Sequence, residues 1–222
     1  MTTPRARRLH PIPASEPRGR LLRRGEFLER PWRIHEIAGD FEVFDVWQLP
    51  TPGGPDDLPL LADMFAGGTG DHGAPPLVRL VCSVRWNLGR LLRWDDPQKG
   101  VGIRVPSLNA RLPDDMADAP IGPDFTRLPF TSVYLLRHEF AAELANATCH
   151  GVLHLGWVKT ESGCWTAQMT VLVKPNGTLG RVYLAGIQPF RRTLVYPAML
   201  RMIERDWRDV PLDGAVRTPT SA

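Results

Sequence analysis

The sequence has 222 residues, of which 43% are apolar, enough to bury a sizeable core in a single domain. The net charge of +3 is unevenly placed, because residues 1–30 carry eight arginines against three glutamates and the remainder sums to −2. The cysteines, Cys82, Cys149 and Cys164, lack metal-ligand spacing, and no apolar run is long enough to cross a membrane. A disulfide scaffold and a membrane-spanning protein are therefore excluded, and we expect a cytoplasmic protein.

Residues 1–30 are rich in arginine and proline and show no sustained periodicity, so we expect a disordered leader. The segment has no apolar core of the kind found in secretory signals. An arginine cluster can attract nucleic acid or anionic lipid without specificity, but a solvated leader is favoured and no specific nucleic-acid partner is predicted. We expect one domain over residues 31–209 and a frayed tail over residues 210–222.

The first half of the predicted domain mixes short elements. Residues 32–37 alternate weakly and suit a strand, whereas residues 41–49 fit either a strand or a helical turn. Residues 56–65 begin with two acids and suit a short helix, and residues 75–92 form a clear amphipathic helix. The proline-rich residues 95–129 make an unusually long connection, for which a lid over a cavity is the functional interpretation.

The second half shows a continuous strand signal followed by one long helical stripe. Apolar residues at helical spacing run from Leu179 to Trp207. Pro189 and Pro197 lie inside this stripe, and each removes a backbone hydrogen bond, so a kink is expected near residues 187–188. The four predicted strands cover residues 131–136, 139–145, 149–158 and 164–173. The order of elements predicts an α+β protein with an antiparallel sheet and a long C-terminal helix.

Three stretches resemble an uncharacterised bacterial family of unknown function over about residues 32–208. They are residues 150–158, residues 173–183 (Val-Lys-Pro-Asn-Gly-Thr-Leu-Gly-Arg-Val-Tyr) and residues 188–191 (Gln-Pro-Phe-Arg). The segments 45–47 and 85–102 resemble it as well. Relatives of this family occur fused to the C-terminus of Rossmann-type short-chain oxidoreductases.

The resemblance implies the START-like, helix-grip fold of the SRPBCC superfamily. In that fold a curved antiparallel sheet wraps around a long C-terminal helix, and two short helices follow the first strand. No Gly-x-Gly-x-x-Gly follows a predicted strand, so the protein is not expected to bind NAD. No other cofactor is predicted. The resemblance supplies no catalytic residues.

Two carboxylates and two imidazoles are the candidate catalytic residues. If Asn146-Ala147 is a two-residue turn, Glu143 lies opposite His150 and Glu139 opposite His154, which would form an acid–base array. The two histidines would be about 13 Å apart along an extended strand, too far to share one ion, so no metal site is expected.

The loop at residues 160–163 decides which sheet face carries this array. A three-residue loop pairs Thr160 with Cys164 and places both histidines opposite the apolar face, either in solvent or under an unseen cover. A four-residue loop pairs Lys159 with Cys164 and turns them into the cavity. Hydrophobic matching favours the first register, because a slip of one residue moves every side chain to the other face. His150 and His154 are therefore interpreted first as surface cross-strand partners, and a buried Glu/His array is the alternative.

We expect the protein to bind a hydrophobic small molecule, lipid-like or polyketide-like, between the sheet and the C-terminal helix. One alternative is a cyclase or dehydratase using the Glu/His array. Another is a non-catalytic interaction module of an oxidoreductase system. The candidate ligand-binding residues are Trp165, Met169, Val171, Tyr183, Ile187 and Phe190.

Overall fold

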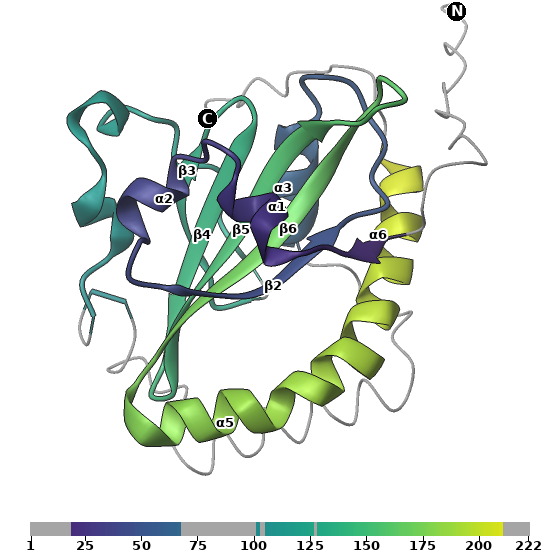
Figure 1. Cartoon of the computed structure of the whole chain (residues 1–222). Coiled ribbons are helices and arrows are strands. Elements are labelled where there is room, and N and C mark those ends of the chain that lie inside the picture. Colours follow the sequence, from purple (N-terminus) through teal and green to yellow (C-terminus); the bar gives the residue numbers. More distant parts are fainter. Residues whose placement is uncertain (1–18, 68–100, 103–104, 127, 211–222) are drawn as a thin grey trace, which may run out of the picture.

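The computed structural model describes residues 19–67, 101–102, 105–126 and 128–210. These residues contain a curved antiparallel sheet in the order β1-β2-β6-β5-β4-β3, with helices on both faces (Figure 1). The strands are β1 (Arg20–Leu21), β2 (Glu42–Gln48), β3 (Thr131–Leu135), β4 (Glu139–Ala145), β5 (Cys149–Lys159) and β6 (Trp165–Pro175). The helices are α1 (Arg24–Leu28), α2 (Ile34–Ile37), α3 (Leu58–Gly67), α5 (Gly177–Phe190) and α6 (Tyr196–Asp209).

The α+β prediction is confirmed, and the architecture is consistent with a helix grip. The four strands predicted in the second half are β3 to β6, and the ambiguous segment 41–49 is the strand β2. The short helix predicted at residues 56–65 is α3. The amphipathic helix predicted at residues 75–92 lies outside the described residues.

Two predictions for the N-terminal part are wrong. Residues 19–30, expected to belong to a disordered leader, contain β1 and α1 instead. Residues 32–37, expected to form a strand, contain the helix α2. A tertiary contact explains α2, because Glu139 on β4 accepts hydrogen bonds from the first backbone N–H groups of this helix, a partner that its local sequence does not reveal.

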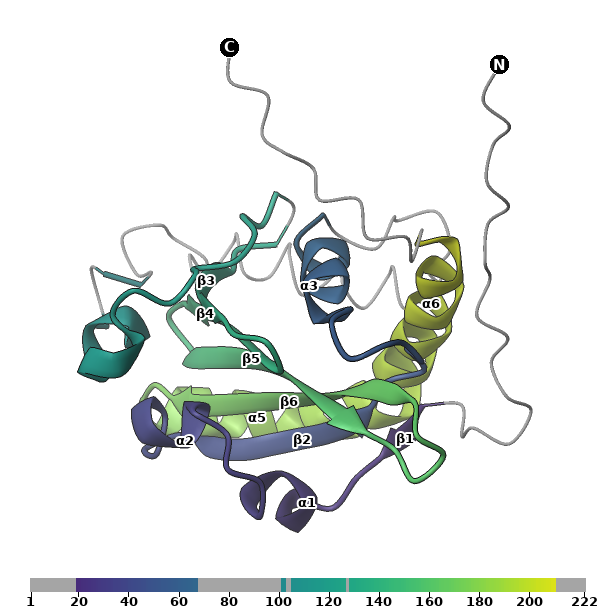
Figure 2. The ribbon, with the colours of Figure 1, turned by 90° about the horizontal axis from the view of Figure 1, so that it is seen from above.

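One face of the sheet, which we call the helix face, packs against α3 and α6 (Figure 2). Leu155, Trp157 and Met169 on the strands meet Leu61 of α3 and Ile203 of α6 in one apolar cluster. Tyr196 at the start of α6 lies against Trp47, with ring centroids 4.8 Å apart. This cluster is the larger of the two main cores, and it joins the sheet to the C-terminal helix.

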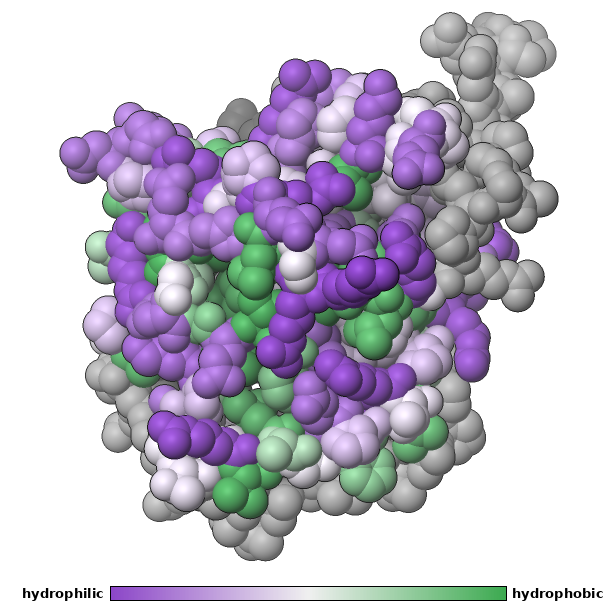
Figure 3. All heavy atoms as spheres, in the orientation of Figure 1, coloured by the Kyte–Doolittle hydropathy of each residue, from purple (hydrophilic) through white to green (hydrophobic). Residues whose placement is uncertain are grey.

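The opposite face, which we call the arm face, is covered by residues 22–41 and 105–119. The first segment includes α1 and α2, and α1 lies across the sheet from α3 and α6 (Figure 2). The second contains two 3-10 helices, η3 (Leu108–Arg111) and η4 (Asp114–Met116). From this side the molecule shows mainly hydrophilic side chains with apolar ones between them (Figure 3). Because both faces are covered, residues 149–157 of β5 are all buried.

A π-helix joins α5 to α6 and spans η5 (Arg191–Val195). The kink predicted near residues 187–188 is therefore displaced, since α5 continues through Pro189 to Phe190. Pro197 has no N–H to give to the preceding turn. The Tyr196 N–H bonds instead to the carbonyl oxygen of Arg191, one residue wider than an α-helical turn. α5, η5 and α6 therefore form one continuous, curved C-terminal helix (Figure 1).

The described helices give no candidate for a membrane span, since none of them is both long enough and apolar enough.

Replacing Gly180 with alanine should destabilise the protein. The new Cβ would lie 2.1 Å from the Thr148 carbonyl oxygen, so α5 would have to move away from the β4–β5 loop. We expect the free energy of unfolding to fall by about 2 kcal/mol in urea titrations. The control is Gly186→Ala in the same helix, where nothing lies within 4 Å of the new Cβ and a gain of about 0.5–1 kcal/mol is expected. Equal losses in the two variants would contradict this account.

Candidate functional site

The two predicted carboxylate–imidazole pairs are present. Glu143 Oε2 lies 2.7 Å from His150 Nε2, and Glu139 Oε1 lies 3.1 Å from His154 Nε2. The predicted two-residue turn is wrong, because Ala145 pairs with His150 and a four-residue loop separates them. The slip is two residues, so each side chain keeps its face and the partners meet diagonally. Asn146 stabilises this longer loop, since its Oδ1 accepts hydrogen bonds from Thr148 and Cys149.

The register favoured for the next hairpin is confirmed. Lys159 pairs with Trp165, the Thr160 N–H donates to the Cys164 carbonyl oxygen, and Gly163 has φ of +89°. The histidines and glutamates therefore lie on the arm face, opposite the apolar helix face. The surface position expected for the histidines is wrong, because the covering segments bury this face: His154 and Glu143 are both 0% exposed.

Glu139 holds the start of α2 against the sheet. Its carboxylate accepts hydrogen bonds from the backbone N–H groups of Arg33 and Ile34, both at 2.8 Å, and from the Tyr134 hydroxyl at 2.5 Å. Burial opposes ionisation, but the hydrogen bonds from His154, Tyr134 and Arg33 outweigh it and hold the pKa of Glu139 below its ordinary value. Burial and the neighbouring Glu139 charge raise the pKa of Tyr134 well above its ordinary value, so this hydroxyl stays a donor.

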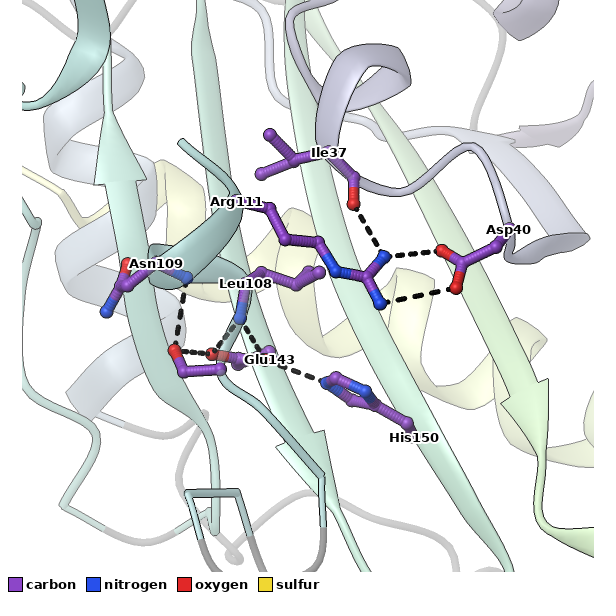
Figure 4. A network of polar contacts seen from close by, with 8 residues as sticks. Ile37, Asp40, Leu108, Asn109, Arg111, Glu143 and His150 are labelled. Carbon is purple, nitrogen blue, oxygen red and sulfur yellow. Dashed lines mark hydrogen bonds and ion pairs between the residues drawn. The ribbon is translucent and has the colours of Figure 1, made fainter. Parts of the chain in front are cut away.

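Glu143 does the same for the second covering segment (Figure 4). Its Oε1 accepts a hydrogen bond from the Ser107 hydroxyl at 2.6 Å. The Leu108 N–H, at the start of η3, lies 3.1 and 3.2 Å from the two carboxylate oxygens. With His150 on Oε2, this buried carboxylate has donors on both oxygens. Each glutamate of β4 thus binds one covering segment.

Charged groups at the rim join the covering segments to each other. Arg111 of η3 donates to Asp40 at 2.6 Å and to the Ile37 carbonyl oxygen at 3.1 Å (Figure 4). Lys174 of β6 lies 2.7 Å from the same aspartate. Hydrogen bonds from Arg111 and Lys174 hold the pKa of Asp40 well below its ordinary value. A second ion pair, Arg33 with Asp115 at 2.7 Å, joins α2 to η4.

Aromatic rings of the first covering segment pack over the Glu/His array on the arm face. Phe27 and Trp32 lie edge-on to His154, with ring centroids 5.4 and 5.3 Å away, and Phe41 lies 4.9 Å from His150. The two carboxylates are already bound to protein donors on both oxygens. This geometry fits groups that hold the layers together, whereas a general acid or base must reach substrate. A catalytic role for these four residues stays a prediction.

The six candidate ligand-binding residues are spread over the helix face and its helix. Met169 is buried in the main core, and Trp165 stacks on His138 with centroids 4.7 Å apart. Val171 and Tyr183 are half-buried beside a small cluster formed by Phe44, Cys149, Val173 and Leu184. Ile187 on α5 is half-buried, and Phe190 is 54% exposed.

A polar cluster on the helix face is not among the predicted residues. Arg192 Nε donates to Asp45 Oδ1 at 3.0 Å, and Arg191 lies 3.8 Å from Asp45 Oδ2. Asp45 is 1% exposed, and its Oδ2 has no hydrogen-bond partner. The Arg191 guanidinium lies over the Phe44 ring, 4.6 Å from its centroid, and donates to the Tyr196 hydroxyl. Burial raises the pKa of Tyr196 well above its ordinary value.

Two backbone irregularities assemble this cluster. A β-bulge between Val43 and Asp45 shifts the pairing of β2 with β6, so Asp45 lies opposite Val171 on the helix face. The π-helix then carries Arg191 and Arg192 at the point where the C-terminal helix passes this strand. The sequence held one clue, an acid in the same alternating series as Trp47 and Leu49, but neither the bulge nor the π-helix has a signature there.

A second feature that the sequence did not reveal is a cavity of about 450 Å³ on the arm face. It lies between α1, β1 and the β5–β6 hairpin. Its floor includes the buried side chains of Thr166 and Gln168. The rim and walls are formed by Arg20, Leu22, Glu26, Arg30, Gln48, Val158, Lys159, Thr160, Glu161 and Ser162.

Within the described residues, no group of three or more histidine, cysteine or acidic side chains could hold a metal ion. Of the two cysteines in this part of the chain, Cys149 is buried and Cys164 is half-buried.

The model of a protein family described as "Protein of unknown function (DUF2867)" matches residues 37–198. This range covers most of the chain, which therefore belongs to that family. A search of curated proteins found no match. A search of solved structures also found none.

Glu139→Gln should weaken the fold and flatten its response to acid. An amide brings N–H donors to a position surrounded by donors, so we expect a loss of about 3 kcal/mol at neutral pH. Because folding lowers the pKa of Glu139, its carboxylate stabilises the fold above the ordinary value of 4.5. That contribution is lost as the pH falls through the folded value. Urea titrations between pH 7 and pH 3 should show a shallower decline below about pH 4.5 in the variant.

The matched control is Glu42→Gln, an exposed carboxylate at the start of β2. It should change the free energy of unfolding by less than about 0.5 kcal/mol and leave the acid limb as in the parent. Parallel acid limbs in the parent and the Glu139 variant would refute the assigned role of this carboxylate.

Proposed function

We propose that this DUF2867 protein binds a hydrophobic small molecule, lipid-like or polyketide-like, between the helix face of the sheet and the C-terminal helix. The resemblance of its motifs to a family that is similar to START-like proteins supports the proposal, as does an architecture consistent with a helix grip. Fold alone does not define function, so the argument depends on the residues of the region.

The observation that carries the proposal is the Asp45 cluster within an apolar region. Small-molecule sites are mostly apolar, with a few polar groups that fix the ligand's orientation. Asp45 Oδ2 and Trp47 Nε1 are both buried without hydrogen-bond partners, two residues apart on the same face of β2. The adjacent π-helix is a feature often found at functional sites.

Half-buried apolar side chains flank the cluster from both layers. Val171 is central in the sheet, paired with Asp45 on one side and Leu153 on the other, yet it remains half-buried. Tyr183 and Ile187 contribute similar side chains from α5. These residues suit an apolar ligand body that lies along the sheet.

The charges of the cluster favour a ligand with an acidic head group. Two arginines surround one aspartate, so the cluster carries an excess positive charge. Arg191 is 19% exposed and can bind a carboxylate through two parallel hydrogen bonds. We therefore expect a long-chain carboxylic acid, or an acidic aromatic compound, to bind more tightly than the matching alcohol.

Titration of the purified protein with a long-chain fatty acid, the alcohol of the same length and an environment-sensitive aromatic dye tests the proposal. The acid should bind saturably, and Val171→Phe should weaken it at least tenfold, about 1.4 kcal/mol, by filling the site. Val182→Phe on the exposed side of α5 is the matched control and should leave the affinity unchanged. If no probe binds saturably, or if both variants bind like the parent, the proposal fails.

Arg191→Gln separates head-group recognition from apolar binding. It should weaken the fatty acid about tenfold and leave the alcohol unaffected, because only the acid loses a charge-assisted hydrogen bond. Equal affinities of acid and alcohol in the parent protein would show that the apolar region binds ligand without the arginine. Arg205→Gln on α6 is the control for the loss of one positive charge.

A further inference from the structure

We propose that the arm-face cavity is a separate binding site for a small organic anion that also carries hydroxyl groups. The cavity volume of about 450 Å³ falls in the range of small-molecule sites. Apart from Leu22 and Val158, its lining residues are polar or charged, unlike those of the helix face, so a ligand with polar groups suits it. The two sites lie on opposite faces of the sheet and can be tested independently.

The cationic rim explains the preference for an anion. Arg20, Arg30 and Lys159 line the cavity with two acids, Glu26 and Glu161. Arg20 lies 3.8 Å from Glu26 and donates to Gln48 at 2.9 Å, so these groups partly satisfy one another. Neither Arg30 nor Lys159 forms an ion pair within the described part of the chain. Two cations at one rim attract a carboxylate or phosphate.

Gln168 supplies a buried polar group at the floor of the cavity. The residue is only 2% exposed, its Oε1 has no hydrogen-bond partner, and its Nε2 reaches the Glu26 carbonyl oxygen only at 3.4 Å. A buried acceptor without a donor costs free energy, so it requires an explanation. A ligand hydroxyl could donate to Oε1 while its anionic group stays at the rim.

More polar atoms without partners continue from Gln168 along the same face. Thr170 Oγ1 is next on β6, and His154 Nδ1 lies on the residue paired with Thr170. Trp32 Nε1 belongs to the indole that lies over Gly156, the residue paired with Gln168. Gly156 has no side chain, and the Trp32 ring occupies the space where a Cβ at this position would lie. The arm face thus has unused hydrogen-bonding capacity beside the cavity.

Isothermal titration of the full chain at low salt, with citrate, malate and glucose 6-phosphate as probes and glucose as the uncharged counterpart, tests the site. We expect saturable binding of at least one anion, no binding of glucose, and an affinity that falls as salt is added. The double variant Arg30→Gln with Lys159→Gln should weaken the binding at least tenfold. Both side chains are exposed, so the fold should be retained.

The charge control is Arg181→Gln with Arg201→Gln, two exposed arginines on the C-terminal helix, and it should bind like the parent. Gln168→Met tests the floor: anion binding should fall at least tenfold, whereas stability against urea should hold or rise, because an unsatisfied acceptor is removed. Absence of saturable binding, or equal weakening by both double variants, would overturn the site. Unchanged affinity in Gln168→Met would overturn the assignment of Gln168 as a recognition group.

Discussion

Two buried carboxylates on one strand determine how the layers of this protein fit together. Glu139 and Glu143 lie on the same face of β4, and each accepts backbone N–H groups from a segment far away in the sequence. Those N–H groups begin short helices and would otherwise be buried without partners. A charged acceptor makes stronger hydrogen bonds than a neutral one, so two side chains suffice to hold α2 and η3 on the sheet. The histidines complete the shell of donors.

This arrangement gives a single sheet two different environments. On the helix face, apolar strands meet α3 and α6, and a bulge in β2 places the buried acid Asp45 on this side. On the arm face, polar groups are covered by the chain itself, and a cavity remains where α1 meets the β5–β6 hairpin. If this face of the sheet were exposed to solvent, the glutamates and histidines would form hydrogen bonds with water and would not be buried. The covering segments are therefore part of the array.

Sequence patterns predicted the strands well because alternation and turn chemistry are local. The three-residue loop before Cys164 was predictable from Gly163, since only glycine readily adopts its positive φ. The β4–β5 loop was not, because its two-residue and four-residue forms place the same side chains on the same face. The pairing of Glu143 with His150 and of Glu139 with His154 therefore survived a wrong register. The helix α2 on the arm face was not predicted, because its first turn depends on a carboxylate more than a hundred residues away in the sequence.

Buried polar atoms that lack a hydrogen-bond partner distinguish candidate recognition groups from polar groups that stabilise the fold. Both oxygens of Glu139 and both oxygens of Glu143 already accept hydrogen bonds from the protein, so these two carboxylates serve to hold the layers together. Asp45 Oδ2 and Gln168 Oε1 are as deeply buried and accept no hydrogen bond, although Arg191 lies 3.8 Å from the Asp45 oxygen. A buried acceptor without a donor lowers stability, so a protein retains one mainly where function requires it. Ligand recognition is one such function. The search for function in this family therefore belongs at Asp45 and Gln168, one on each face of the sheet, before the histidine pairs.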